Sequence, residues 1–72
     1  MTIELTYTEI TQKTVRFAID GKEVEVSLTK EMFEWNFSII RKEKELTVKE
    51  LTEICKLIYS EGVLKAEDCI RI

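Results

Sequence analysis

The 72-residue sequence contains no histidine and no proline, and it has only two cysteines and two glycines. Histidine is the most common general base and a frequent metal ligand, so its absence argues against an enzyme. Two cysteines without histidine cannot complete a tetrahedral zinc site. Small disulfide scaffolds carry four or more cysteines, so we expect Cys55 and Cys69 to be reduced thiols. The sequence therefore predicts no catalytic activity, no cofactor, no metal and no small-molecule substrate.

Long apolar runs and a strong charge of one sign are also missing. No run approaches the roughly 20 apolar residues that span a bilayer, and the first residues lack the pattern of a signal peptide. The net charge of −3 disfavours nucleic acids and anionic membranes as partners. With 44% hydrophobic and 35% charged residues, the composition is typical of a globular domain. We expect a single domain, residues 1–72, located in the cytoplasm.

The clearest local pattern is a β-hairpin over residues 15–28. Two alternating runs flank Asp20-Gly21, a dipeptide that favours a two-residue type I′ turn. This turn places Phe17 opposite Val24, with Arg16 opposite Glu25 on the other face. Residues 2–8 alternate in the same way and predict a third strand. In that strand Ile3, Leu5 and Tyr7 share one face, opposite Ile19, Phe17 and Val15 respectively.

Two helices are predicted to cover the apolar face of this sheet. Thr29 is a candidate N-cap for a helix that continues to about Lys44. Thr47 and Glu50 have the spacing of a capping box, which predicts a second helix that ends at Gly62. Residues 64–72 fit either a short strand or one or two helical turns. The predicted fold is therefore α+β: a three-stranded antiparallel meander, with a fourth short C-terminal strand as an option, covered on one face by an antiparallel helical hairpin.

The first predicted helix carries apolar side chains over an arc of about 200°, which is wide for a helix on a sheet. Two interpretations remain open: both sides of the arc pack inside the chain, or one side meets a partner. Three strands make a sheet about 14 Å wide, whereas two packed helices need nearly 20 Å. This overhang favours self-association or a larger protein partner. The candidate protein interface comprises Met32, Trp35, Asn36, Phe37 and Ile39.

A basic cluster around the predicted interhelical turn offers an alternative. Its residues are Arg41, Lys42, Lys44 and Lys49. Glutamates interleave with these side chains and offset their field, so a small DNA- or RNA-binding regulator is the second hypothesis. The first is a non-catalytic protein-interaction module that self-associates and acts as an accessory or inhibitor of a larger protein. The richness in isoleucine, lysine and glutamate resembles coding from an AT-rich bacterial or phage genome.

Overall fold

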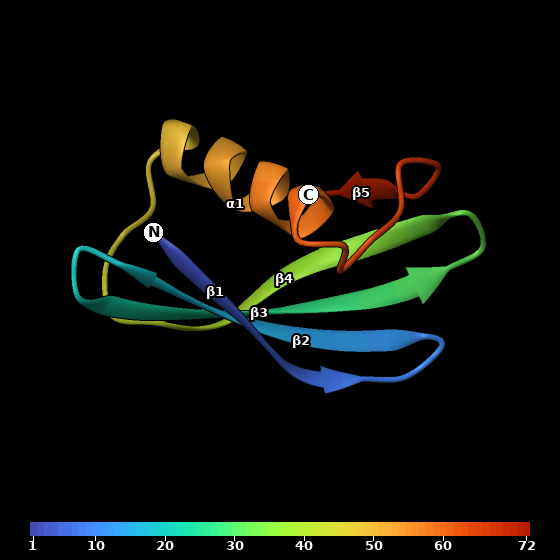
Figure 1. Cartoon of the computed structure of the whole chain (residues 1–72), viewed down its shortest axis with the longest axis horizontal. Helices are drawn as coiled ribbons and strands as arrows, with labels where there is room; N and C mark the ends of the chain where they lie inside the picture. The colour runs from blue at the N-terminus through green and yellow to red at the C-terminus, as the bar shows by residue number, and fades with distance from the viewer.

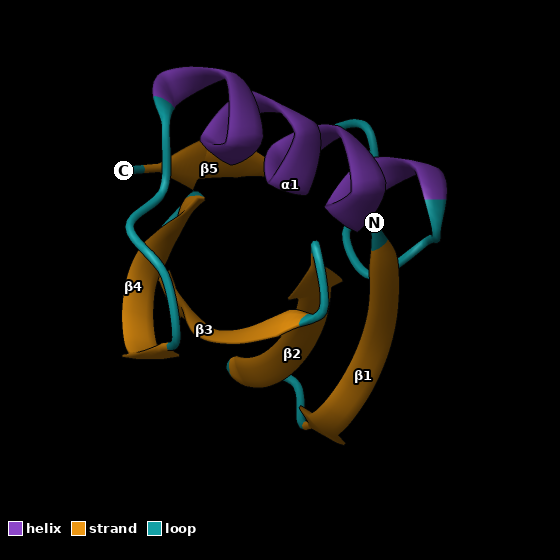
Figure 2. Cartoon of the chain, turned by 90° about the vertical axis from the view of Figure 1, so that its left-hand side faces the viewer, coloured by secondary structure: helices purple, strands orange, loops and turns teal.

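The computed structural model describes residues 1–72, which form one curled sheet and one helix. The elements, in chain order, are β1 (Thr2–Thr8), β2 (Gln12–Ile19), β3 (Lys22–Glu31), β4 (Glu34–Lys42), α1 (Val48–Ser60) and β5 (Cys69–Arg71). The strands lie side by side in the order β1-β2-β3-β4-β5. The first four form an antiparallel meander, and β5 joins β4 in parallel. The sheet curls around the core, and α1 lies across its open side (Figures 1 and 2).

The predicted helical hairpin is wrong, because residues 29–31 end β3, residues 32–33 form a turn and residues 34–42 form β4. Trp35, Phe37 and Ile39 pair with Lys30, Leu28 and Val26 of β3, so they share the inner face of the sheet. Their spacing has a period of two residues. On a helix, the same apolar side chains would cover an arc of about 200°, which is too wide for one packing surface. With only one helix, the overhang that favoured self-association disappears.

The hairpin around Asp20-Gly21 is confirmed, with the predicted register. Phe17 pairs with Val24, and Arg16 pairs with Glu25. Asp20 and Gly21 have φ values of 52° and 75°, as a type I′ turn requires. The loop therefore needs no contact from elsewhere in the chain to define the pairing of β2 with β3.

The predicted pairing of β1 with β2 is wrong. Ile3 and Leu5 pair two residues away from their predicted partners, and a β-bulge then shifts the register before Tyr7. Ile3 pairs with Phe17 and Leu5 with Val15, but Tyr7 pairs with Thr14. Thr6 is therefore an extra residue, a β-bulge, and its hydroxyl donates to the Thr14 carbonyl at 3.1 Å. Because Thr14 lies on the outer face, the bulge also moves Tyr7 to that face.

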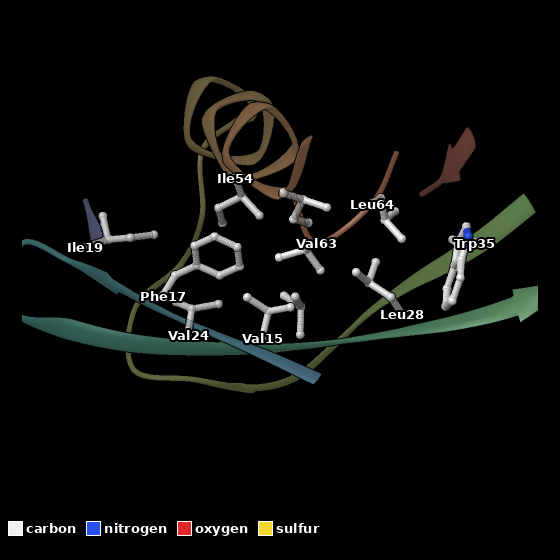
Figure 3. Packing of buried hydrophobic residues seen from close by; sticks show 11 residues of the cluster. Val15, Phe17, Ile19, Val24, Leu28, Trp35, Ile54, Val63 and Leu64 are labelled. Atoms are coloured by element: carbon white, nitrogen blue, oxygen red, sulfur yellow. The ribbon is translucent and has the colours of Figure 1, made fainter. Parts of the chain in front are cut away.

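The core lies between the inner face of the sheet and α1. Phe17, from the middle of the sheet, lies below Ile54 of the helix (Figure 3). The buried apolar cluster comprises Val15, Phe17, Ile19, Val24, Val26, Leu28, Trp35, Ile54, Ile58, Val63 and Leu64. No polar or charged residue as a whole is buried. The cluster thus draws on β2, β3, β4, α1 and the segment that follows α1, whereas β1 contributes only the partly buried Ile3.

Both ends of α1 are capped by the residues that the sequence indicates. The Thr47 hydroxyl accepts from the Glu50 amide at 3.1 Å, and the Thr47 amide donates to the Glu50 carboxylate at 3.0 Å. This confirms the capping box. At the other end Gly62, with φ 76°, lets the Val63 amide donate to the Ile58 carbonyl at 3.0 Å. The turn brings Val63 into the core beside the helix.

The helix also provides the crossover that a parallel pair of strands requires. The chain passes from β4 through α1 to β5, and Trp35 of β4 pairs with Ile70 of β5. Residues 69–71 thus adopt the strand, one of the two structures that the sequence left open. The single helix falls short of the length and apolarity needed to cross a membrane.

Acid is expected to weaken the start of α1 through Glu50. The Lys44 ammonium, followed by the Thr47 backbone, lowers the pKa of Glu50 below its ordinary value of 4.5. The unfolded chain therefore binds a proton at Glu50 more readily than the folded protein does. The stabilisation by Glu50 is present above about pH 4.5 and is lost as the pH falls through the lower, folded-state pKa.

Urea unfolding of the protein and of Glu50→Gln, followed by circular dichroism between pH 7 and pH 3, measures this contribution. The difference in unfolding free energy between the two proteins should shrink as the pH falls. A difference that stays constant over this range would contradict the role of the ionised carboxylate.

Candidate functional site

Two β-hairpins present their turns at the same end of the sheet. Residues 9–11 connect β1 to β2, and residues 32–33 connect β3 to β4. The Lys30 amide donates to the Thr11 carbonyl at 2.8 Å and so ties the second hairpin to the first turn. Figure 1 shows both turns at the end opposite the Asp20-Gly21 turn. Their axes are two strand spacings, or about 10 Å, apart.

Large apolar side chains occupy both of these turns. Ile10 is 87% exposed, Met32 is 82% exposed and Phe33 is 86% exposed. We call these three residues the hairpin end. Turns usually carry small or polar residues, and exposed apolar side chains that gather at one place mark interaction surfaces. These three are the most exposed of the large hydrophobic side chains in this protein.

The backbone at Met32 is strained. Met32 has a φ of 57°, and Phe33 does not have a positive φ. A positive φ at only the first central residue is the pattern of a type II′ turn, in which glycine is the usual residue. For a residue with a side chain, the left-handed region costs roughly 1–2 kcal/mol. A glycine would remove this cost but would also remove the methionine side chain from the turn.

Negative charge surrounds the turn at Met32. Glu31 and Glu34 pair directly across the strands, an arrangement of like charges that is unfavourable. The Glu31 carboxylate accepts from the Asn36 amide at 2.6 Å, and Glu34 lies 3.6 Å from the Arg71 guanidinium. A cavity of about 300 Å³ lies beside Met32 and Phe33, and Glu31, Glu34 and Arg71 border it. An apolar surface with a basic side chain at its edge would complement this cavity.

Two lysines near the hairpin end face inward instead. The ammonium groups of Lys13 and Lys30 lie 5.9 and 6.0 Å from the centre of the Trp35 ring. Both distances are within the range of a cation–π contact. The indole Nε1 is buried and has no hydrogen-bond partner. The ammonium groups of Lys13 and Lys30 therefore lie at cation–π distance from the buried tryptophan, and Lys13 also donates to the Thr8 hydroxyl at 3.2 Å.

Tyr7 and Glu9 extend the polar border of the hairpin end on the β1 side. Partial burial is the main cause that raises the pKa of Tyr7, followed by a hydrogen bond to Glu9 and the charge of that carboxylate. Glu9 directly precedes Ile10 in the turn, so a further carboxylate lies near the hairpin end and adds to its acidic surroundings.

The residues predicted as a protein interface do not form one surface. Met32 belongs to the hairpin end, but Trp35 is in the core and Phe37 is half-buried on the inner face. Asn36 pairs with Thr29 on the outer face and bonds Glu31, and Ile39 is 38% exposed at the inner face. The strand alternation sends neighbouring members of this set to opposite sides of the sheet.

The predicted basic cluster is divided among local ion pairs. Arg41 lies 3.9 Å from Glu23, Lys42 lies 2.9 Å from Glu45, and Lys44 contacts both Glu50 and Asp20. Lys49 is on the first turn of α1, beside a cavity of about 390 Å³ that also carries Glu50 and Glu53. Each cation therefore has carboxylates close by, which lowers the attraction of this region for phosphate.

Ile10 and Phe33 were not among the predicted interface residues. Ile10 is the only large apolar residue between the strands at 2–8 and 12–19, where no packing pattern requires one. That position is a usable sequence signal. Phe33 gave no comparable signal, because it was assigned to one side of a helix that does not form.

The fold and this surface define a class of protein: a small β-sheet domain, closed by one helix, with an apolar and acid-bordered hairpin end. No family model, no curated protein and no solved structure matches the chain.

Proposed function

We propose that this protein is a non-catalytic interaction module that docks on a larger protein through its hairpin end and acts as its accessory or inhibitor. The observation that carries the proposal is that two neighbouring turns expose Ile10, Met32 and Phe33 together. Association would remove these side chains from water, and clustered apolar anchors commonly provide most of the binding energy at protein interfaces.

Local costs to stability support the same assignment. Met32 holds a left-handed backbone, and Glu31 faces Glu34 across the strands. A glycine at position 32 and an uncharged residue at position 31 would remove both penalties. Strained residues cluster at functional sites, where binding rather than folding accounts for their presence. The hairpin is therefore better explained by what it contacts than by the stability of the domain.

The chemistry of the hairpin end indicates what kind of surface it would bind. Its centre is apolar, and its border carries three carboxylates, Glu9, Glu31 and Glu34, against one guanidinium, that of Arg71. The partner should offer an apolar recess with lysine or arginine at the edge, so that charge complements charge. An anionic membrane or a nucleic acid would be repelled by the same border.

The non-catalytic part of the proposal is supported by the nucleophiles that the chain offers. It has no histidine to activate a serine. Burial raises the pKa of the Cys55 thiol, so the reactive thiolate is scarce at physiological pH. Cys55 and Cys69 are both free, and free thiols support a proposed location in a reducing compartment such as the cytoplasm.

Affinity capture from a lysate of the source cells tests this function, with three versions of the full chain as bait. Met32→Gly/Phe33→Ser removes both apolar side chains of one turn while relieving the backbone strain. Val48→Ser is the matched control, because Val48 is 80% exposed but lies on α1. A protein captured by the unmodified chain should also be captured by Val48→Ser and should bind the double variant at least tenfold more weakly.

Urea unfolding should show that the double variant is no less stable than the unmodified protein, since glycine adopts the required φ freely. Capture of the same protein by all three baits with equal affinity would disprove the role of the hairpin end. Glu31→Gln adds a charge test: it removes the facing glutamate pair while its amide oxygen can still accept from Asn36, so it should weaken binding without lowering stability.

A further inference from the structure

The outer edge of β1 is open. β1 is hydrogen-bonded to β2 alone, so every second residue of its other edge has unpaired backbone groups. Edge strands are usually protected by proline or by several charges, but β1 has no proline and one charged side chain. That side chain, Glu4, lies 3.8 Å from Arg16 of the same chain, which partly offsets its charge. β1 is therefore suited to pair with another strand.

The bulge at Thr6 limits such pairing to the first part of the strand. Up to Leu5 the strand is regular, with Ile3 and Leu5 on the inner face. Beyond the bulge Tyr7 lies on the outer face, so one regular partner strand cannot match both halves. The regular half of β1 also exposes apolar side chains to solvent. Met1 and Leu5 are each 44% exposed, and Ile3 and Leu5 line a cavity of about 210 Å³ with residues 61–63.

A second copy of the same segment complements this half in one register. Paired residues must share a face, so a two-fold antiparallel pair can centre on Ile3 or on Glu4. The register centred on Glu4 places two glutamates directly opposite each other, which is unfavourable. The register centred on Ile3 places Met1 opposite Leu5 and Thr2 opposite Glu4. It aligns apolar side chains on the inner face and separates the two carboxylates.

We propose that two copies of this chain associate through residues 1–5, in the antiparallel register centred on Ile3. The two five-stranded sheets then form one continuous sheet. Met1 and Leu5 of each copy extend the apolar row of the other and cover the cavity beside residues 61–63. Because the strands run in opposite directions, the hairpin ends lie at opposite ends of the dimer. Each stays free, so self-association does not depend on the proposed function.

Cysteine cross-linking tests the register directly, in a Cys55→Ala/Cys69→Ser background. Thr2 and Glu4 are exposed on the outer face, so a cysteine at either position leaves the core intact. Directly opposed residues have the Cα separation that a disulfide needs, whereas positions two residues out of register do not. A mixture of Thr2→Cys and Glu4→Cys should therefore give a covalent species of twice the 8.5 kDa chain mass. Glu4→Cys alone should give at least tenfold less.

A mixture of Thr2→Cys and Ser38→Cys measures the background of random cross-linking, because Ser38 lies on β4, away from the β1 edge. Oxidation is carried out at about 0.5 mM protein, since an interface of this size gives weak association. Sedimentation equilibrium of the unmodified chain should show its mass rising toward the dimer over the same concentration range. A dominant Glu4→Cys homodimer, cross-linking no greater than the background, or a monomer at every concentration would each overturn the proposal.

Discussion

Phe17→Ala is expected to remove roughly half of the unfolding free energy of this protein. Phe17 is fully buried, and in its row of the sheet it lies between Ile3 of β1 and Val24 of β3, below α1. Replacing a buried phenylalanine by alanine costs about 3–5 kcal/mol, because apolar contacts are lost and a cavity remains. A domain of about 70 residues has a total stability of only some 4–10 kcal/mol. This one substitution therefore removes a large part of the stability of the fold.

Urea unfolding followed by far-ultraviolet circular dichroism measures the loss. Phe33→Ala is the matched control, because it makes the same chemical change at an exposed side chain of the hairpin end. Surface substitutions of this kind usually change stability by less than about 0.5 kcal/mol. Equal effects of the two substitutions would contradict the placement of Phe17 in the core and Phe33 outside it.

Trp35→Ala is expected to have an effect of similar size and to release the C-terminal strand. Trp35 pairs with Lys30 of β3 on one side and with Ile70 of β5 on the other. Removing the indole costs about 3–5 kcal/mol and also ends the cation–π contacts of Lys13 and Lys30. Because β5 has only three residues, it depends on this packing more than the longer strands do. Amide hydrogen exchange of residues 69–71 should accelerate more than that of β2 and β3.

Trp35→Phe separates the effect of the indole N–H on stability from that of the packed aromatic ring. A buried donor without a partner costs about 1–3 kcal/mol, so losing it offsets part of the lost packing. We expect the change in unfolding free energy to be no more than about 1 kcal/mol. In the unmodified protein the fluorescence of Trp35 should be blue-shifted and poorly quenched by iodide. Ready quenching, or no loss of stability in Trp35→Ala, would contradict the burial of Trp35 in the core.

The elements that sequence reasoning identified correctly are those whose signals are local. Asp20-Gly21 defines a turn by its own backbone preferences, and Thr47 with Glu50 caps α1 through contacts three residues apart. The candidate site was less accessible. Met32 was named as an interface residue, but Ile10 and Phe33 were not, because only the pairing of four strands brings the two turns to one end. The affinity-capture experiment tests whether these residues form a binding site.

The sequence alone determined one hairpin, one capped helix and the presence of one further strand at residues 2–8. Tertiary structure decided the state of residues 29–44, because their apolar residues fit either period until the other strands are in place. Their turn, at Met32 and Phe33, contains no residue that favours a positive φ, so no local signal reported it. Pairing with β3 on one side and β5 on the other provides the hydrogen bonds and the buried surface that make this segment a strand.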